Sequence, residues 1–186
     1  NVDFGGGLER LLAAVENKND IFLTSLFNSI VDTIELLTNK NYKEYSKNIR
    51  IVIDHLVASI FIISAGVTPS NKEQGYVLRR LLRRGLDNFY NLGGSEVDPV
   101  IESIVNQYKS TDPDLLKHFQ NIKNTILQEK DAYDTTLRKA KEYIFKKYQT
   151  IGDELKGQIE ISADDAFFLY ASHGLSPSQI INLGYV

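Results

Sequence analysis

Four arginines stand within six positions of this chain, in the segment GYVLRRLLRRG. On a helix their spacing gathers the side chains on one broad face about two turns tall. The residues are Arg79, Arg80, Arg83 and Arg84, with Val77, Leu78, Leu81 and Leu82 on the other side. A guanidinium group presents a fork of N–H donors that matches phosphate oxygens. The cluster therefore predicts a phosphate-binding face, of the kind that binds RNA.

The same arginines have a purely structural interpretation. Like charges this close repel each other by a few tenths of a kcal/mol per pair. Acidic residues elsewhere would then neutralise them, or some would form bridges to buried carboxylates such as Asp54. The residues alone leave both interpretations open.

The composition is that of an ordinary globular protein, with 42% hydrophobic and 24% charged residues among 186. This length suffices for one large domain or two small ones with a real core. A net charge of −3 argues against a surface coated with basic residues, but it allows a local basic stripe.

Several classes of site are excluded by the residues present. The chain has no cysteine, so we expect no disulfide partner and no thiolate metal site. Its histidines, His55, His118 and His173, have no metal-ligand spacing, and we predict no metal site. No apolar run approaches the ~20 residues of a membrane span, and no signal peptide is visible. The first residue is Asn1 and not methionine, so we expect a piece of a longer protein.

The elements that position the arginines are predicted to be helices, because apolar residues recur at helical spacing and proline is rare. We expect an all-α domain with a long amphipathic helix in its C-terminal half. The predicted helices cover Leu8–Val15, 21–37, 42–65, an arginine helix from Ser70 to Gly93-Gly94, a long helix opened by Asp112-Pro113, and two short ones in SADDAFFLYASHG and SPSQIINLG. Ser70 and Glu73 predict a capping box. The one expected strand is 1–4.

Three segments carry a resemblance to a known family. VDFGGGLERL resembles motif 3 of the alanyl-tRNA synthetases, written VDTGMGLERL there. The run IRIVIDHLVASIFIISAGVTPSNKEQGYVLRRLLRR resembles the family's Asp-His helix followed by GVxPSNxxxGYVLRRxxRR. AFFLYASHGLSPSQ is similar to the family's AFxLYDTYGFP segment, a weaker match.

The resemblance implies a division of the chain and an activity. Residues 1–20 would be the C-terminal end of a class II catalytic domain, as a stub of strand and motif 3 helix. Residues 21–186 would be the helical tRNA-recognition domain. The full-length protein would be an alanine–tRNA ligase that uses ATP with Mg²⁺ in protein biosynthesis, in the cytoplasm or alternatively in an organelle. Because motifs 1 and 2 would precede Asn1, this chain alone is expected to be inactive and to bind no cofactor.

Catalytic-domain roles carry over to four residues of motif 3. Asp3 corresponds to the aspartate that holds the α-amino group of alanine, although it could instead cap a strand end. Gly5 and Gly7 would let backbone approach ATP. Arg10 corresponds to the arginine on the ATP γ-phosphate, where it would stabilise charge on the leaving pyrophosphate.

Recognition roles carry over to the second segment. Asn71 corresponds to the asparagine that approaches the wobble pair of the tRNA acceptor stem, and it could also cap a helix. The four arginines correspond to those along the acceptor stem of the tRNA for alanine. The Asp54–His55 pair is interpreted as core hydrogen bonding without a chemical role, and His118 and His173 as surface residues.

At several positions the sequence departs from the family pattern, which affects the roles that the resemblance implies. Gly6 replaces a methionine, Val57 an arginine, and Asp87 stands where another arginine is common. Ala171 replaces the aspartate that pairs with the asparagine to read a guanine–uracil wobble at the third pair. We therefore expect weaker dependence on that pair.

Two other hypotheses compete with a ligase fragment. A non-catalytic tRNA-binding paralogue would keep the helical domain, but it would need neither Asp3 nor Arg10. A purely structural helical protein would leave the arginine face without a purpose.

Overall fold

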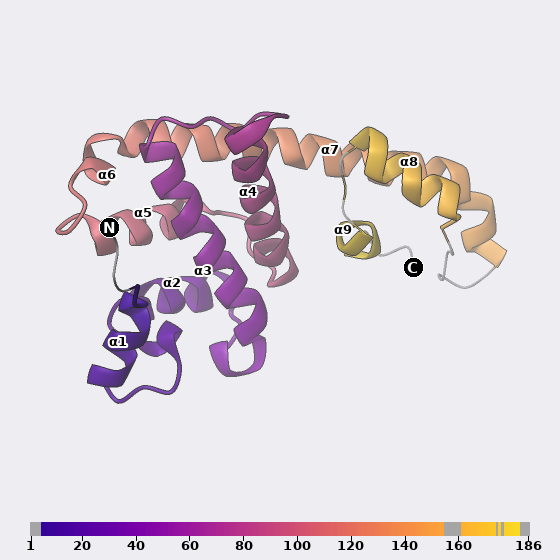
Figure 1. The fold of residues 1–186 in the computed structure, drawn as a ribbon. Helices are drawn as coiled ribbons and strands as arrows, with labels where there is room; N and C mark the ends of the chain where they lie inside the picture. Colours follow the sequence, from indigo (N-terminus) through magenta and orange to yellow (C-terminus); the bar gives the residue numbers. More distant parts are fainter. Residues whose placement is uncertain (1–4, 155–160, 174, 176, 183–186) are drawn as a thin grey trace. The chain divides into compact units, whose positions relative to one another are not determined.

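The computed structural model of the chain describes residues 5–154, 161–173, 175 and 177–182 (Figure 1). The chain divides into two compact units, Asn1–Glu129 and Lys130–Val186, which are described separately. Within the described ranges the regular elements are all helical, which confirms the all-α class. No helix in those ranges is both long and apolar enough to cross a membrane.

The first unit begins with three short elements, α1 (Leu8–Val15), the 3-10 turn η1 (Ile21–Leu23) and α2 (Asn28–Thr38). A continuous helix was expected over 21–37, and that prediction is wrong at residues 24–27. The Asp20 carboxylate accepts from the Phe22 N–H at 3.0 Å, and the Thr24 hydroxyl donates to the Ile21 carbonyl at 2.6 Å. These local side-chain bonds satisfy the backbone in a tight turn and so compete with helix continuation.

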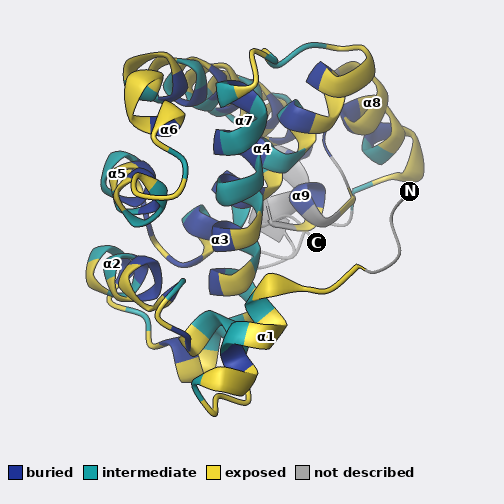
Figure 2. Ribbon diagram, turned by 60° about the vertical axis from the view of Figure 1, so that its left-hand side comes forward, coloured by how far each residue is buried: buried dark blue, intermediate teal, exposed yellow. Residues whose placement is uncertain are grey.

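The core of the first unit is a helical hairpin of α3 (Tyr42–Ser64) and α4 (Glu73–Asn91), which pack along each other (Figure 1). Each helix buries one stripe at spacings of three and four residues. The buried stripes are Ile49, Val52, Ile53, Leu56, Ile60 and Ile63 on α3, and Leu78, Leu82, Leu86 and Phe89 on α4. Figure 2 shows buried positions along α3. Gly85 permits the close approach, because a Cβ there would lie 3.4 Å from the His55 Cβ.

The rest of the first unit is α5 (Asp98–Tyr108), the short α6 (Asp114–Lys117) and the first part of α7 (Phe119–Glu154). Sequence reasoning missed α5, although Pro99 in its first turn is a start signal. Asp112-Pro113 opens only α6, and the long helix begins after a break at His118. A long helix of 36 residues, α7, is present in this part of the chain.

A polar cluster ties η1 to α3. The Asp20 carboxylate accepts from the Tyr42 hydroxyl at 2.7 Å and from Arg50 Nη2 at 2.6 Å. Burial, together with the neighbouring carboxylate, raises the pKa of Tyr42 to about 12, so this hydroxyl remains a donor at neutral pH. The cluster fixes the N-terminal end of α3 against the turn before α2.

The second unit consists of the end of α7 with α8 (Ala163–His173) and α9 (Pro177–Asn182). Asp165 on α8 is buried and joins α8 to α7. Its carboxylate accepts from the hydroxyls of Tyr143 and Tyr148, from Lys147 Nζ and from the Ser162 hydroxyl. These donors, led by the lysine, hold the pKa of Asp165 well below its ordinary value.

The sequence predicted a capping box at Ser70 and Glu73 and a strand over residues 1–4. The capping box is wrong, because α4 has Lys72 at its N-cap and no side-chain cap bond. The Ser70 hydroxyl instead bonds within the loop, to the N–H and the carbonyl of Lys72. The expected strand 1–4 lies outside the described residues.

Replacing Gly75 with alanine is expected to destabilise the first unit. The added Cβ would lie 2.2 Å from Ser70 Oγ and 2.5 Å from the Thr68 carbonyl oxygen, so the loop must move. Alanine in a helix would otherwise gain about 1 kcal/mol over glycine, and we expect a net loss of roughly 2 kcal/mol from overpacking. Urea unfolding measures the free energy of unfolding of the variant. Gln74→Ala, at an exposed neighbour, is the control. A loss of stability in Gly75→Ala no larger than in the control would contradict the close approach of Gly75 to Ser70 and Thr68.

Candidate nucleic-acid interface

A short loop between α3 and α4 presents Asn71. The Ser70 N–H donates to the Gly75 carbonyl at 3.0 Å, which closes the loop onto the first turn of α4. Glu73, directly after the loop, has a φ of 48°, in the left-handed region that non-glycine residues rarely adopt. Such a conformation costs on the order of 1 kcal/mol and persists where the surrounding bonds impose it. Asn71 therefore sits on an exposed but fixed loop.

The α4 arginines divide into two pairs by burial. Arg79 and Arg83 lean toward α7, with side chains 26% and 16% exposed, and meet the carboxylate of Glu129, which is only 6% exposed. Arg83 Nε donates to Glu129 Oε1 at 2.7 Å. Arg79 Nε lies 3.5 Å from Glu129 Oε2, too far for a good hydrogen bond, so this contact is ionic.

Arg80 and Arg84, on the same turns of α4, are exposed to solvent. The Arg80 guanidinium lies 5.7 Å from the ring centre of Tyr76, within the range of a cation–π contact. Tyr76 is itself half-exposed. A cation beside an accessible ring is a surface that suits both phosphate and base or sugar contacts.

The orientation of the Asn71 amide follows from chemistry. Arg79 Nη1 donates to the Asn71 side-chain oxygen. Because arginine carries donors only, the amide must turn its oxygen toward Arg79. The Asn71 amide nitrogen then faces away from Arg79, and none of the described residues accepts a hydrogen bond from it.

Sequence reasoning proposed Asp54 as a carboxylate for the arginines and missed Glu129. Asp54 is 67% exposed and instead pairs with His55, whose Nδ1 lies 2.9 Å from it. Burial lowers the pKa of His55, with a smaller contribution from the charge of Arg84. A signal for Glu129 was available, because it falls on the apolar stripe of α7, three residues after Ile126 and four before Tyr133.

The motif 3 segment is described from Gly5 onward, so the prediction for Asp3 lies outside the described residues. Gly7 is the N-cap of α1, and its carbonyl accepts from the Arg10 and Leu11 N–H groups at 3.1 Å. The Arg10 stem folds back over Gly7, where a Cβ would lie 3.4 Å from Arg10 Cδ, and nothing lies within 4 Å of a Cβ at Gly5. An exposed arginine beside bare backbone suits a polyphosphate.

Ala171 lies on α8 in the second unit and is exposed. Its neighbours Phe167 and Tyr170 are also exposed, at 68% and 57%. His118 is on the surface as expected, whereas the side chain of His173 lies outside the described residues.

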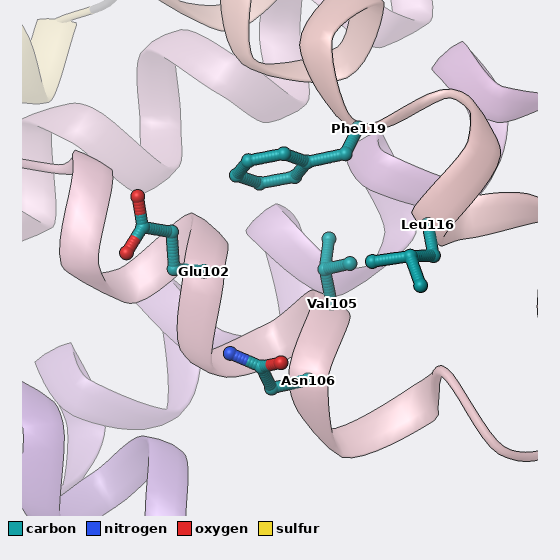
Figure 3. Close-up of a pocket in the computed structure, with 5 residues that line it drawn as sticks. All are labelled: Glu102, Val105, Asn106, Leu116 and Phe119. Carbon is teal, nitrogen blue, oxygen red and sulfur yellow. The ribbon is translucent and has the colours of Figure 1, made fainter.

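Two cavities lie among the described residues of the first unit. One of about 220 Å³ lies between α5 and the α6–α7 junction, and Figure 3 shows Leu116 pointing toward Val105 in it. Its carboxylate, Glu102, lies 3.5 Å from Lys123 Nζ. A second cavity, of about 370 Å³, holds Ser64 and His118, whose side chains lie 3.3 Å apart. In the described part of the chain no three His, Asp or Glu side chains gather as a metal site.

Comparison with known proteins places the sequence of this chain in a family. The model of the class II (A) tRNA synthetases matches residues 1–183, which include both the motif 3 segment and the arginine helix. The chain belongs to the class II (A) tRNA synthetase family. Within it, the chain is 35% identical over 180 residues to the alanine–tRNA ligase of Thermotoga sp. (strain RQ2). It is 34% identical over 179 residues to those of Rickettsia canadensis (strain McKiel) and Clostridioides difficile (strain 630).

The resemblance to alanyl-tRNA synthetases is thereby confirmed. Each of these alignments covers 94% of this chain but 20% of the relative, so the chain spans about a fifth of the synthetases it matches. The individual roles of Asp3, Gly5, Gly7, Arg10, Asn71 and the four arginines are not tested by these alignments and stay predictions.

Arg83→Ala is expected to lower the free energy of unfolding by roughly 3 kcal/mol, because it leaves a buried carboxylate without its closest cation. Arg84→Ala, one residue away and exposed, should change it by no more than about 0.5 kcal/mol. Urea unfolding followed by circular dichroism measures both. Equal effects of the two substitutions would show that the Glu129 pair is not the buried interaction described above.

Proposed function

We propose that this chain forms the acceptor-stem-recognition part of an alanine–tRNA ligase. The observation that carries the proposal is the exposed ridge of α4, with Arg80 and Arg84 outward and Asn71 fixed at the helix start. Phosphate contacts from the arginines would set the register along the stem, and Asn71 would reach base edges. The minor groove of A-form RNA is wide and shallow, so a loop residue can enter it.

The full-length protein, on this proposal, attaches alanine to its tRNA using ATP with Mg²⁺. Gly5, Gly7 and Arg10 support an ATP role, since they combine bare backbone with an exposed cation. ATP would supply the adenylyl group that activates alanine, with pyrophosphate as the leaving group, and Arg10 would hold the γ-phosphate. The face of α1 formed by Leu8, Leu11 and Val15, between 58% and 84% exposed, suits burial against a catalytic domain.

A non-catalytic tRNA-binding paralogue is the alternative. It would use α4 in the same way but would have no use for Arg10. The two are separated by ATP–pyrophosphate exchange with alanine in the full-length protein, where Arg10→Ala should abolish turnover in a ligase while leaving RNA binding by α4 intact.

The double substitution Arg80→Ala, Arg84→Ala is expected to weaken binding of an acceptor-stem hairpin by this chain. The slope of log affinity against log salt should become shallower by about two units, one for each phosphate that an arginine no longer neutralises. Fluorescence anisotropy across a salt series measures it. Lys43→Ala, Lys47→Ala is the matched control, because it removes two exposed charges four residues apart on α3. An equal effect of the control would mean that only net charge matters.

Discrimination of the wobble pair is expected to be modest. Reading the exposed guanine amino group needs an acceptor, and Ala171 offers a methyl group where the family has a carboxylate. The Asn71 oxygen is already bonded to Arg79, and one neutral hydrogen bond contributes only about 1 kcal/mol, near fivefold.

Hairpins that differ only in guanine–uracil against guanine–cytosine at the third pair should therefore differ less than about tenfold in affinity. Ala171→Asp should raise this ratio, and Ser172→Asp, which adds the same charge at the exposed neighbour, should not. A ratio of several hundredfold in the unsubstituted chain would contradict the prediction.

A further inference from the structure

One carboxylate of α7 occupies a position that the helix otherwise gives to apolar side chains. Glu129 is 6% exposed, lies on the stripe of Ile122, Ile126 and Tyr133, and uses both oxygens toward α4. Its partners are Arg79 and Arg83, two of the four arginines for which the sequence leaves both a phosphate-binding and a structural interpretation open. Placing a charge in the core is costly, so the position calls for an explanation.

We propose that Glu129 determines the specificity of RNA reading by withholding Arg79 and Arg83 from phosphate and by orienting Asn71 through Arg79. This inference rests on the proposed function of the α4 surface. It makes Glu129 a positioning residue, since it acts on the RNA only through other side chains.

The first half of the proposal concerns charge. Sequence-independent affinity for nucleic acid comes from cations that reach phosphates, and it grows with their number. Glu129 draws the Nε edges of Arg79 and Arg83 into the protein, whereas Arg80 and Arg84 stay at the surface. Only two of the four adjacent arginines thus point outward, which limits sequence-independent binding to nucleic acid.

The second half concerns orientation. Arg79 contacts Glu129 with its Nε edge and donates to the Asn71 oxygen with Nη1. A planar guanidinium that faces a carboxylate with one edge and an amide oxygen with another is restricted in its orientation. The chain Glu129–Arg79–Asn71 therefore fixes which face of the Asn71 amide is presented, with its N–H donors directed away from Arg79. In the minor groove such donors suit base acceptors.

The decisive variant is Glu129→Gln, which keeps the shape and one acceptor oxygen but removes the charge. Released arginines should reach phosphates, so the salt slope for an acceptor-stem hairpin should steepen by up to about two units. Affinity for wobble and Watson–Crick hairpins should rise alike. Asn71→Ala, which should cost about fivefold in the unsubstituted chain, should cost less than about twofold in the Glu129→Gln background.

A control and a spectroscopic readout accompany this variant. Asp131→Asn removes an exposed carboxylate from the same helix and should change neither the slope nor the Asn71 penalty. Without RNA, nitrogen-15 spectra should show an Arg83 Nε–H signal that exchanges slowly with water, because this group donates to Glu129, and its exchange should be faster in Glu129→Gln.

A second variant decides the matter if Glu129→Gln does not fold. Arg79→Lys keeps the charge beside Glu129 but cannot contact it and Asn71 with two edges of one plane. It should leave the salt slope unchanged and still remove the penalty of Asn71→Ala. A retained penalty would overturn the orientation half.

The outcomes separate this inference from the function beneath it. If the unsubstituted chain binds hairpins without salt dependence, the proposed function fails and the inference fails with it. If it binds with salt dependence but Glu129→Gln leaves both the slope and the Asn71 penalty unchanged, only the inference is overturned. If Glu129 had only a structural role, Glu129→Gln would lower the free energy of unfolding without steepening the slope of log affinity against log salt.

Discussion

The arrangement of the α4 arginines depends on the contact between the Glu129 carboxylate of α7 and the two inward arginines, Arg79 and Arg83. Arg83 Nε donates to it at 2.7 Å in a setting where the carboxylate is almost wholly buried. A buried ion pair of this kind is a poor source of net stability, since an apolar pair of similar size would hold two helices together at least as well. What the ion pair adds is direction, because the Arg83 Nε–H must face a Glu129 oxygen to make its hydrogen bond.

The contacts of Glu129 also influence the orientation of side chains at the surface. Arg79 continues from Glu129 to Asn71, and the loop carrying Asn71 is closed by the Ser70–Gly75 backbone bond. Gly75 is required there because a side chain would meet Ser70 and Thr68. The segment PSNKEQGY thus holds Asn71 in a closed loop at the start of α4. The two outward arginines, Arg80 and Arg84, follow on the same helix.

Much of the fold could be predicted because it rests on periodicity. The helices α1, α3, α4, α8 and α9 and the long α7 follow from apolar spacing and end near the expected residues. The errors arose where side chains compete with the helix, as Asp20 and Thr24 do before α2 and as Ser70 does before α4. A sequence pattern shows that such a residue can cap, but only the path of the chain decides which backbone group it bonds.

The candidate site could be predicted only in part, for a related reason. Arginine spacing placed four charges on one side of α4, but four adjacent arginines on a helix span more than a quarter of its circumference, so neighbours can face different surroundings. Which pair turns inward depends on where a carboxylate lies on another helix, and Glu129 is 46 residues from Arg83 in sequence. Its place on the apolar stripe of α7 marks it as exceptional, since a charge on such a stripe must find a partner across the core. A charged residue that interrupts an apolar stripe therefore identifies which members of a distant cationic cluster are structural, and by elimination which remain at the surface for a ligand.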